Sequence, residues 1–426
     1  MMENENVKRN KKEWLWVPSL YFTEGLPYVI IISVSVVMYK KLGLDNSEIG
    51  LYTSWFYLPW VLKPLWSPLV DIISTKRRWF AGMQLFLTLI FLGIGLSLST
   101  NTYLIVSLAL FWMAAFASAT HDIAADGYYL LGLTQDKQSL FIGVRSTFYR
   151  LAMITGQGFI VVFAGIMEVQ YASPQKAWSA TMILTAILMF LLTLLNFFST
   201  SEVSENIAQE EKPGFIEIFT SFFRKEQIWV VLAFIFSYRL GESQLLKMAA
   251  PFLLDTPEKG GIGFTTAQHG FIYGTLGLIA LLTGGILGGI LISKDGLGKW
   301  MLPMLLALNI PNLFYAILAF VQPDSIIIAT IVVIIEQLGY GFGFTAFMMY
   351  LIFVSEGISK TAHYAIATGL MALGMMLPGM ISGYIQEYLG YPLFFIWVLI
   401  AAVPALFLVK KLRFPHDYGK KTRVHN

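Results

Sequence analysis

Three side chains that can carry charge lie inside an otherwise apolar stretch, FASATHDIAADGYYLLG, at residues 116–132. Asp122 and Asp126 are four residues apart, so on a helix they share one face. His121 points about 100° away from Asp122 and is expected to be a hydrogen-bonded packing residue. A charged side chain at the centre of a bilayer costs at least ~2.5–3.5 kcal/mol, so each carboxylate should face a partner or a water-filled cavity.

The composition of the chain predicts that this stretch lies in a membrane. Of the 426 residues, 56% are hydrophobic and only 13% are charged, whereas soluble domains average about 25% charged residues. There is no cysteine, and the five histidines are too scattered for a metal motif. No G-x-x-x-x-G-K-[ST] phosphate loop occurs, so we expect neither ATP hydrolysis nor a metal or other cofactor.

A bilayer-spanning helix needs ~20 mainly apolar residues, and the sequence contains twelve windows of this kind. The first is too long for a cleaved signal peptide and is expected to be a spanning helix. The windows are 14–39, 47–73, 79–99, 102–131, 138–167, 175–200, 227–254, 265–293, 299–321, 326–355, 361–389 and 391–411.

The basic residues predict the orientation of these spans. If both termini are cytoplasmic, the inner segments contain 20 of the 29 lysines and arginines, and the outer loops contain four. This asymmetry follows the rule that positive charge stays on the cytoplasmic side. We therefore expect a multi-pass protein of an inner membrane with both termini in the cytoplasm.

The longest polar stretch lies between the sixth and seventh windows and resembles a cytoplasmic linker. It divides the chain into an N-terminal six-helix bundle (1–200), a linker (201–226) and a C-terminal six-helix bundle with a short tail (227–426). Residues 215–223 are expected to form a short surface helix. Two six-helix bundles joined in this way are the architecture of major facilitator transporters, although other polytopic proteins share the pattern.

Further charges lie at membrane depth in other windows. Glu24 is about ten residues from the cytoplasmic end of the first window, in TEGLPY, where glycine and proline predict a kink. Lys63 lies in the second window, where it either binds an anion or extends to the interface. The seventh window contains Arg239, Glu242 and Lys247, and the tenth contains Glu336.

Depth along antiparallel spans predicts partners for the two aspartates. The fourth and fifth windows turn near residue 135, which places Asp126 level with Arg145 and Asp122 level with Arg150. These pairs are expected to face the interior of the bundle, either as parts of a transport site or as static salt bridges. Arg239 and Glu242, three residues apart, are expected to neutralise one another or to form the C-terminal half of a site.

Several aromatic residues near these charges are able to stack on a sugar ring, although packing is the commoner role for such residues. They are Trp55, Trp60, Trp112, Tyr149 and Tyr340. The glycine-rich segments TGGILGG and PGMISG have the spacing of ordinary close helix packing.

Five motifs together resemble the AmpG family of anhydromuropeptide permeases. They are GLPY (25–28), LKPLWSPLVD (62–71), SATHDIAADGYY (118–129), FYRLAM (148–153) and SYRLGE (237–242). The D-I-x-x-D pattern is shared with the related acetyl-CoA transporters and with some siderophore importers. His121 replaces the family's glutamine, and the loop after the second window keeps Asp71 and its basic cluster but loses the glycines.

The resemblance implies proton-coupled import of a muropeptide or amino sugar by a monomeric secondary transporter. The residues expected to take part in proton coupling are Asp122, Asp126, Glu24, Glu242 and Glu336. Those expected to contact the cargo are Arg150, Arg239, Lys63, Arg145, Trp60 and Tyr149. Those expected to act as a conformational gate are Asp71, Lys76, Arg77 and Arg78.

One coupling scheme is that an anionic cargo takes Arg150 from Asp122 and thereby favours protonation of the acid. The alternatives are another cargo on the same fold (a siderophore, an oligosaccharide or acetyl-CoA), a membrane-embedded enzyme, and a substrate sensor. The enzyme is disfavoured because Asp122 and Asp126 lack a nucleophile or metal partner. A sensor usually carries a soluble output domain, and no segment here is long enough for one.

Overall fold

A computed structural model describes residues 2–203, 215–357 and 360–421. Within these ranges every regular element is helical, and no strand occurs. Contacts divide the chain into two compact units. Unit 1 comprises Met1–Leu42, Leu62–Gln209 and Thr266–Gly270, and unit 2 comprises Gly43–Val61, Glu210–Thr265 and Phe271–Asn426.

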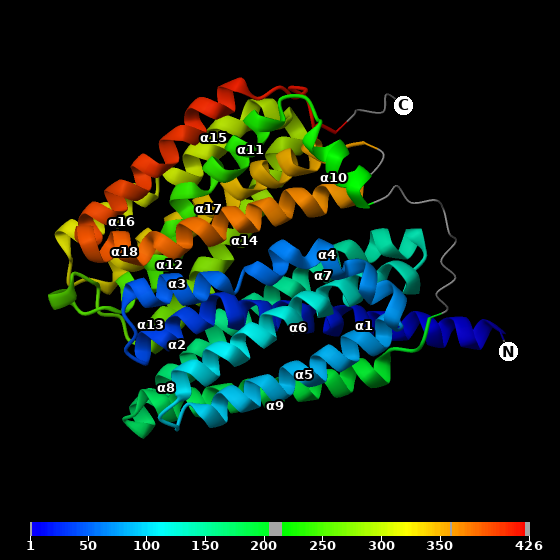
Figure 1. The fold of residues 1–426 in the computed structure, drawn as a ribbon, viewed down its shortest axis with the longest axis horizontal. Helices are drawn as coiled ribbons and strands as arrows, with labels where there is room; N and C mark the ends of the chain where they lie inside the picture. Colours follow the sequence, from blue (N-terminus) through cyan, green and yellow to red (C-terminus); the bar gives the residue numbers. More distant parts are fainter. Residues whose placement is uncertain (1, 204–214, 358–359, 422–426) are drawn as a thin grey trace. The chain divides into compact units, whose positions relative to one another are not determined.

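Unit 1 is built on long helices that lie side by side, with α5 between α6 and α9 (Figure 1). Its core contains Tyr21, Phe80, Tyr128 and Phe141. Its helices are α1 (Met2–Val29), η1 (Ile30–Val34), α2 (Ser35–Lys41), most of α4 (Leu58–Ile73), α5 (Lys76–Ser97), α6 (Tyr103–Gly132), α7 (Gln135–Ile154), η2 (Thr155–Ile160), α8 (Val161–Tyr171) and α9 (Pro174–Ser199).

Unit 2 contains the remaining helices, and its two largest cores are lined by aromatic residues such as Phe234, Phe347, Phe252 and Phe395. Its helices are α3 (Asn46–Trp55), α10 (Phe215–Phe223), α11 (Ile228–Tyr238), α12 (Leu240–Leu254), η3 (Pro257–Lys259), the end of α13 (Thr266–Phe271), η4 (Ile272–Gly277), α14 (Leu278–Asp295), α15 (Leu297–Asn309), α16 (Asn312–Val321), α17 (Ile326–Val354), α18 (Lys360–Leu408) and η5 (Val409–Lys411). The short helix expected at residues 215–223 is thus confirmed as α10.

Nine helical segments of the described chain are long and apolar enough to cross a membrane. The twelve expected windows are all helical, but the second is divided into α3 and α4, the seventh into α11 and α12, and the ninth into α15 and α16. The last two windows merge into α18, which is interrupted at Gly390 by a positive φ of 72°. The all-helical membrane fold is confirmed, and the number of twelve spans stays a prediction.

Where two helices pack closely, glycine permits the approach. A Cβ atom on Gly284 of α14 would lie 2.1 Å from the Leu338 carbonyl oxygen, and one on Gly341 of α17 would lie 1.9 Å from the Leu281 oxygen. The α14–α17 contact therefore requires glycine from both helices, as the glycine spacing in TGGILGG predicts.

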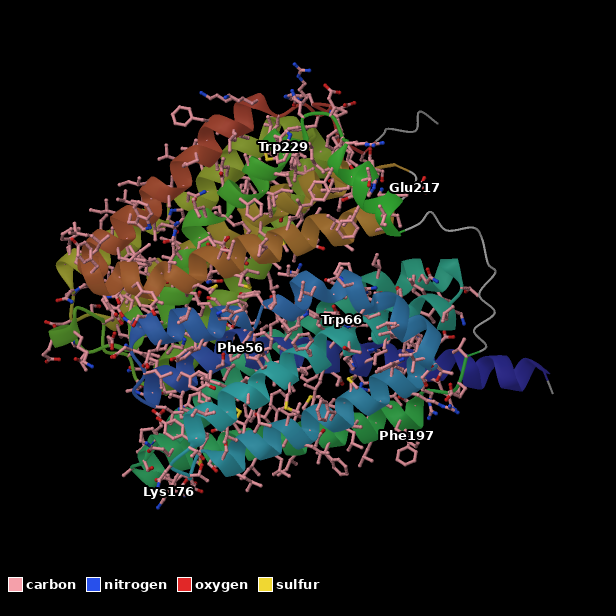
Figure 2. The ribbon with its side chains drawn as sticks, in the orientation of Figure 1. Phe56, Trp66, Lys176, Phe197, Glu217 and Trp229 are labelled. Carbon is pink, nitrogen blue, oxygen red and sulfur yellow. The ribbon has the colours of Figure 1, made fainter. Side chains whose placement is uncertain are left out.

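The outer faces of the helices expose large apolar side chains. Phe197 at the end of α9 projects from the ribbon (Figure 2) and is 48% exposed. Trp229 is 80% exposed and Val169 is 85% exposed. Contiguous exposed apolar surface of this extent is unfavourable in water and is favourable against lipid.

Candidate functional site

Unit 1 brings together the acids and bases that the sequence places at membrane depth. Glu24 comes from α1, Lys63 from α4, Asp122 and Asp126 from α6, and Arg145 from α7. These five residues, here called the charge cluster, interact electrostatically with one another. Glu24 is buried, whereas the side chains of Lys63, Asp122, Arg145 and Asp126 are 28%, 19%, 31% and 41% exposed.

Lys63 is the partner of Asp122, with the lysine Nζ atom against Asp122 Oδ2. The expected pair of Asp122 with Arg150 is therefore wrong. Counting residues from the turn gives the height of a side chain but not the direction in which it points around the helix. The side chain of Asp122 instead contacts α4, a helix that a count along α6 and α7 does not consider. Lys63 therefore binds this acid and does not only extend to the interface.

The expected pair of Asp126 with Arg145 is confirmed, with Arg145 Nη2 3.0 Å from Asp126 Oδ1. The Tyr21 hydroxyl donates a hydrogen bond of 2.9 Å to the same carboxylate oxygen. The Arg145 guanidinium also lies 4.4 Å from the centre of the Tyr21 ring and 5.1 Å from that of Tyr129. These contacts fix the arginine between α1, α6 and α7.

Glu24 is the acid of the cluster that has no basic residue of its own. It is 8% exposed, and its carboxyl group lies against that of Asp122. Its nearest charged neighbours include Asp122, Asp126 and Lys63. Three carboxylates thus share two cations, so the fully ionised cluster carries one negative charge that no basic residue of the cluster compensates.

Arg150 lies in α7, five residues beyond Arg145, and is half-buried. Among the described residues it makes no ion pair with a carboxylate. A partly buried arginine without a carboxylate retains its capacity to bind an anion in bidentate fashion.

His121 belongs to a hydrogen-bonded network behind the acids, as expected for a packing residue. Its Nε2 atom is 2.9 Å from Gln84 Nε2, and Asn196 Nδ2 donates to Gln84 Oε1 at 3.4 Å and to Thr23 Oγ1 at 3.0 Å. Ser19 completes the chain with a 2.6 Å bond to Asn196 Oδ1. The network joins α1, α5, α6 and α9, and Thr23 and His121 adjoin Glu24 and Asp122 in sequence.

The position of Glu24 depends on the close approach of α1 and α7. A Cβ atom on Gly25 would lie 2.7 Å from the Tyr149 carbonyl oxygen. Instead of breaking at Pro27, α1 continues and changes to the π-helical turn Ile30–Val34 three residues later. The ring of Tyr149 lies 6.4 Å from that of Tyr28, so Tyr149 packs against α1.

The basic residues expected to form a gate anchor the end of α9. Arg77 donates to the Phe197 carbonyl at 2.9 Å, and both Arg77 and Arg78 approach Glu202 at 3.6 Å. Lys76 is 6% exposed and packs over Gly127 of α6. The side chain of Asp71 lies outside the described residues.

Unit 2 contains a second ion pair at the break between α11 and α12. Arg239 donates to both oxygens of Glu242 at 2.6 and 2.8 Å and to the Tyr340 hydroxyl at 2.8 Å. The pair is almost fully buried, with Arg239 5% and Glu242 1% exposed. The expected neutralisation of these two residues is confirmed, and Tyr340 serves as a hydrogen-bond partner of the arginine.

Two further charged residues of unit 2 are buried. Lys247 is 5% exposed and donates to Thr53 Oγ1 of α3 at 2.8 Å, and among the described residues no carboxylate pairs with it. Glu336 is 1% exposed and accepts a 3.1 Å hydrogen bond from Gln337. Trp60 also belongs to unit 2 and is half-buried.

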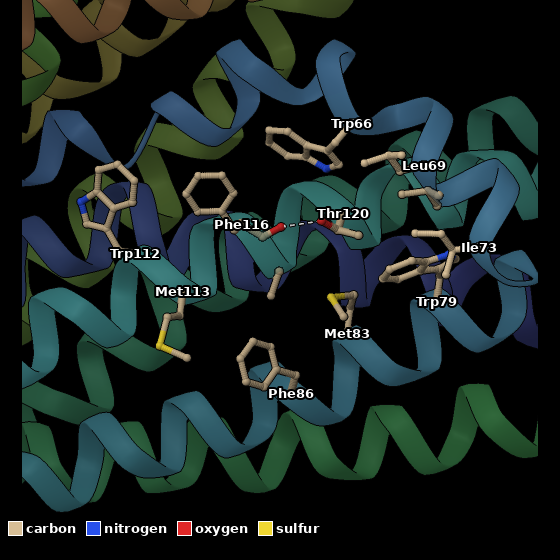
Figure 3. A pocket seen from close by; sticks show the side chains of 12 residues that line it. Trp66, Leu69, Ile73, Trp79, Met83, Phe86, Trp112, Met113, Phe116 and Thr120 are labelled. Atoms are coloured by element: carbon tan, nitrogen blue, oxygen red, sulfur yellow. Dashed lines mark hydrogen bonds between the residues drawn. The ribbon is translucent and has the colours of Figure 1, made fainter.

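An apolar crevice of about 440 Å³ lies between α4, α5 and α6 (Figure 3). Trp112 lines it beside Phe116, and the Thr120 hydroxyl is turned to the Phe116 carbonyl oxygen at 2.8 Å. Because the rest of the lining is apolar or indole, this crevice lacks the polar groups that a sugar requires. The interpretation of Trp112 as a packing residue fits this better than sugar stacking.

Three residues that contact the charge cluster or its hydrogen-bonded network were not predicted from the sequence. They are Tyr21, Gln84 and Asn196. An asparagine or glutamine inside an apolar window is the signal that identifies the network residues, because a buried amide needs partners. In the described residues no three histidine, cysteine, aspartate or glutamate side chains group as metal ligands.

Comparison with known proteins shows which sequences and structures this chain resembles. A sequence model of the Major Facilitator Superfamily matches residues 19–383. The anhydromuropeptide permease of Escherichia coli K12 is 26% identical over 415 residues, covering 96% of this chain and 80% of the relative. A Rickettsia felis relative, named as an AmpG transporter, is 26% identical over 419 residues, covering 92% and 94%. The resemblance to AmpG-type permeases is therefore confirmed at modest identity.

Solved transporters share the fold. The nucleoside transporter NupG superimposes with a TM-score of 0.69 at 16% identity, over 93% of this chain and 97% of its own. A D-xylose-proton symporter gives a TM-score of 0.69 at 12% identity, over 96% and 98%. At such identities the likeness establishes the major facilitator fold and leaves the cargo to be argued from the site.

Proposed function

The chain belongs to the Major Facilitator Superfamily, and on this premise we propose that it imports an anionic, cell-wall-derived muropeptide or amino sugar by proton symport. The family and its relatives indicate that the chain is a multi-pass secondary transporter of small molecules. The cargo is suggested by the relatives named as permeases of anhydromuropeptides.

The observation that supports proton coupling is that the cluster contains more acidic than basic residues. Glu24, Asp122 and Asp126 share two basic partners, Lys63 and Arg145. One bound proton makes the group electrically neutral, and neutrality is strongly favoured where charges are desolvated. Glu24, which is buried against the carboxylate of Asp122, is the carboxylate that we assign to carry this proton.

Cargo binding is coupled to this proton through the cations. An anionic cargo that draws Lys63 away from Asp122 would leave a second carboxylate uncompensated, which makes proton uptake by the Glu24–Asp122 pair more favourable. The proton in turn releases Lys63 for the cargo, because coupling between two ligands is reciprocal. Substrate and proton then bind cooperatively, as symport requires.

Arg150 is the residue that we assign to the first capture of the anion. It carries a permanent positive charge at membrane depth and makes no ion pair with a described carboxylate. Its planar guanidinium matches a lactyl or peptide carboxylate with two parallel hydrogen bonds. Arg145 and Arg239 have bound acids of their own, so we assign them to positioning rather than to the first contact with cargo.

The remaining expectations stay part of the proposal. Both termini lie in the cytoplasm of a cell with an inner membrane, the protein is a monomer, and it catalyses no covalent reaction. The basic residues from Lys76 to Arg78 hold the linker end of unit 1 during the transport cycle, consistent with their contacts to Phe197 and Glu202.

The proposal is tested by uptake into proteoliposomes. The radiolabelled probe is N-acetylglucosaminyl-anhydro-N-acetylmuramyl peptide, measured with and without an inward proton gradient. We expect the gradient to stimulate uptake severalfold and Asp122→Asn to abolish the stimulation. The matched control is Asp324→Asn in an exposed loop, which should transport like the parent.

Each outcome of this assay has a defined meaning. Stimulated uptake that depends on Asp122 supports muropeptide symport. No uptake by folded protein removes the muropeptide as cargo, and free amino sugars and siderophores are then tested in the same vesicles. Cleavage of the probe in detergent by the parent, but not by Asp122→Asn, would replace the transporter with a membrane-embedded enzyme.

A further inference from the structure

A group of buried polar atoms in unit 2 has no hydrogen-bond partner. The group comprises Oδ1 of Asn309 and both polar atoms of Asn312, and the buried hydroxyl of Tyr315 lies beside it against Glu336. These residues are 6%, 0% and 0% exposed. An unsatisfied buried polar group costs about 1–3 kcal/mol, so the two asparagine side chains, three residues apart, require an explanation.

The three residues lie at a break in a membrane-spanning segment. Helix α15 ends at Asn309, and α16 begins at Asn312 after Ile310 and Pro311. Proline has no N–H, so the carbonyl group of Ala307 receives no helical hydrogen bond from position 311. Broken helices at this depth expose carbonyl oxygens that coordinate small cations in other transporters.

Helix α17 presents a carboxylate to this break. Leu308, Asn312 and Tyr315 follow one face of α15 and α16, and Glu336, Gly339 and Gly343 follow one face of α17. A Cβ atom on Gly343 would lie 2.5 Å from Leu308 Cβ, and one on Gly339 would lie 2.2 Å from the Ala307 oxygen and 2.9 Å from Pro311 Cγ. The two faces therefore pack against each other.

The depth of the residues agrees with this register. Asn312 is nine residues from the end of α16 at Val321, and Glu336 is ten residues from the start of α17 at Ile326. At 1.5 Å per residue, both lie roughly 14–15 Å from the same ends of their helices. Tyr315, one turn further along, interacts with Glu336 both electrostatically and through a side-chain hydrogen bond.

We propose that Glu336, Asn309, Asn312 and Tyr315 form a binding site for a small monovalent cation of the Na⁺ and Li⁺ class. Together with the Ala307 carbonyl they offer one carboxylate and four neutral oxygen donors, which are hard ligands. A proton alone would need only the carboxylate, and it would leave the two amide oxygens unexplained. With one carboxylate and no other described acidic or histidine ligand grouped with it, the site suits a single positive charge.

The role of this site in coupling rests on the proposed function. The site would make the C-terminal half of the transporter responsive to Na⁺. Glu336 lies on α17, whose residue Tyr340 binds Arg239 one turn away. Occupation of the site by a cation would fix α17 against α15 and α16. The binding of the cation itself does not depend on the identity of the cargo.

The test measures Na⁺ binding without cargo. Purified full-length protein is heated in NaCl, LiCl, KCl and choline chloride at equal ionic strength, and ²²Na⁺ binding is measured in parallel. We expect NaCl or LiCl to raise the Tm by at least about 2 °C over KCl and choline. Asn312→Leu and Glu336→Gln should abolish both this shift and the ²²Na⁺ signal.

Two controls keep the result interpretable. Asn101→Leu and Glu258→Gln make the same chemical changes at exposed loop positions and should retain the Na⁺ effect. If Glu336→Gln does not fold, Asn309→Ala removes a single oxygen and should weaken ²²Na⁺ binding at least tenfold. Folded parent protein without a Na⁺-specific shift, or a shift that persists in Asn312→Leu, would overturn the site.

The failure of this inference is distinguishable from failure of the proposed function. Proton-stimulated muropeptide uptake by a chain that binds no Na⁺ would remove the cation site and leave the transporter. Na⁺ binding by a chain that imports no muropeptide would retain the site and remove the cargo.

Discussion

Lys63 on α4 and Asp122 on α6 form an ion pair that joins the second apolar window of the chain to the fourth. The side chains are 28% and 19% exposed, so the pair is only partly shielded from solvent. It is one of two cation–carboxylate pairs that leave Glu24 as the third acid of the cluster.

Removing the lysine should destabilise the protein more than removing both partners. Lys63→Met leaves Asp122 without its cation, and we expect a loss of about 1–3 kcal/mol, between the values for exposed and buried pairs. Lys63→Met with Asp122→Leu should recover part of this loss. Thermal unfolding in detergent measures the difference, and equal losses in the single and double variants would contradict the assignment.

Glu24→Gln mimics the protonated carboxylate and should separate cargo movement from proton movement. We expect uptake that no longer responds to an inward proton gradient, together with cargo exchange that persists across vesicles loaded with unlabelled cargo. The control is Glu258→Gln in an exposed loop. Retained gradient stimulation in Glu24→Gln would show that another carboxylate carries the proton.

Arg150 and Arg145 should differ in their effects on stability and transport. Arg150→Ala removes no described ion pair, so its Tm should stay within about 2 °C of the parent while the apparent KM for an anionic cargo rises about tenfold or more. Arg145→Ala breaks the pair with Asp126 and should lower the Tm. The apparent KM is measured from initial rates over a range of cargo concentrations. An unchanged KM in Arg150→Ala would exclude the anion contact.

The close approach of α1 and α7 at Gly25 should be sensitive to small increases in size. A side chain there meets the Tyr149 carbonyl oxygen, so Gly25→Val should destabilise by about 1–3 kcal/mol and displace Glu24. Gly82→Val is the control, because no atom lies within 4 Å of a Cβ at that position. Similar Tm values for the two variants would show that α1 and α7 are less tightly packed.

The hydrogen-bonded network behind the acids should contribute to stability through Asn196. Asn196→Leu leaves Gln84, Thr23 and Ser19 with lost partners in a buried place, and we expect a loss of about 1–3 kcal/mol. Asn101→Leu in an exposed loop should have little effect. A thermal melt of both variants, side by side with the parent, tests this expectation.

The amino-acid sequence by itself determined much of this protein. Long apolar windows with few charges can exist only as membrane helices, because a backbone in lipid must satisfy its own hydrogen bonds. Residue counting from the turn between α6 and α7 also gave the correct partner for Asp126, since Arg145 lies at the same height on the next helix. Spacing alone paired Arg239 with Glu242, because residues three apart on a helix are neighbours.

Only the tertiary structure decided which helix each buried polar side chain meets. Periodicity fixes the height and relative face of a residue but not the rotation and neighbours of its helix, which depend on packing between distant segments. Asp122 therefore binds Lys63 rather than Arg150, and Gln84 meets Asn196 across 112 residues of chain. Asn312 and Glu336 lie at one level for the same reason, since the glycine face of α17 packs on the break between α15 and α16.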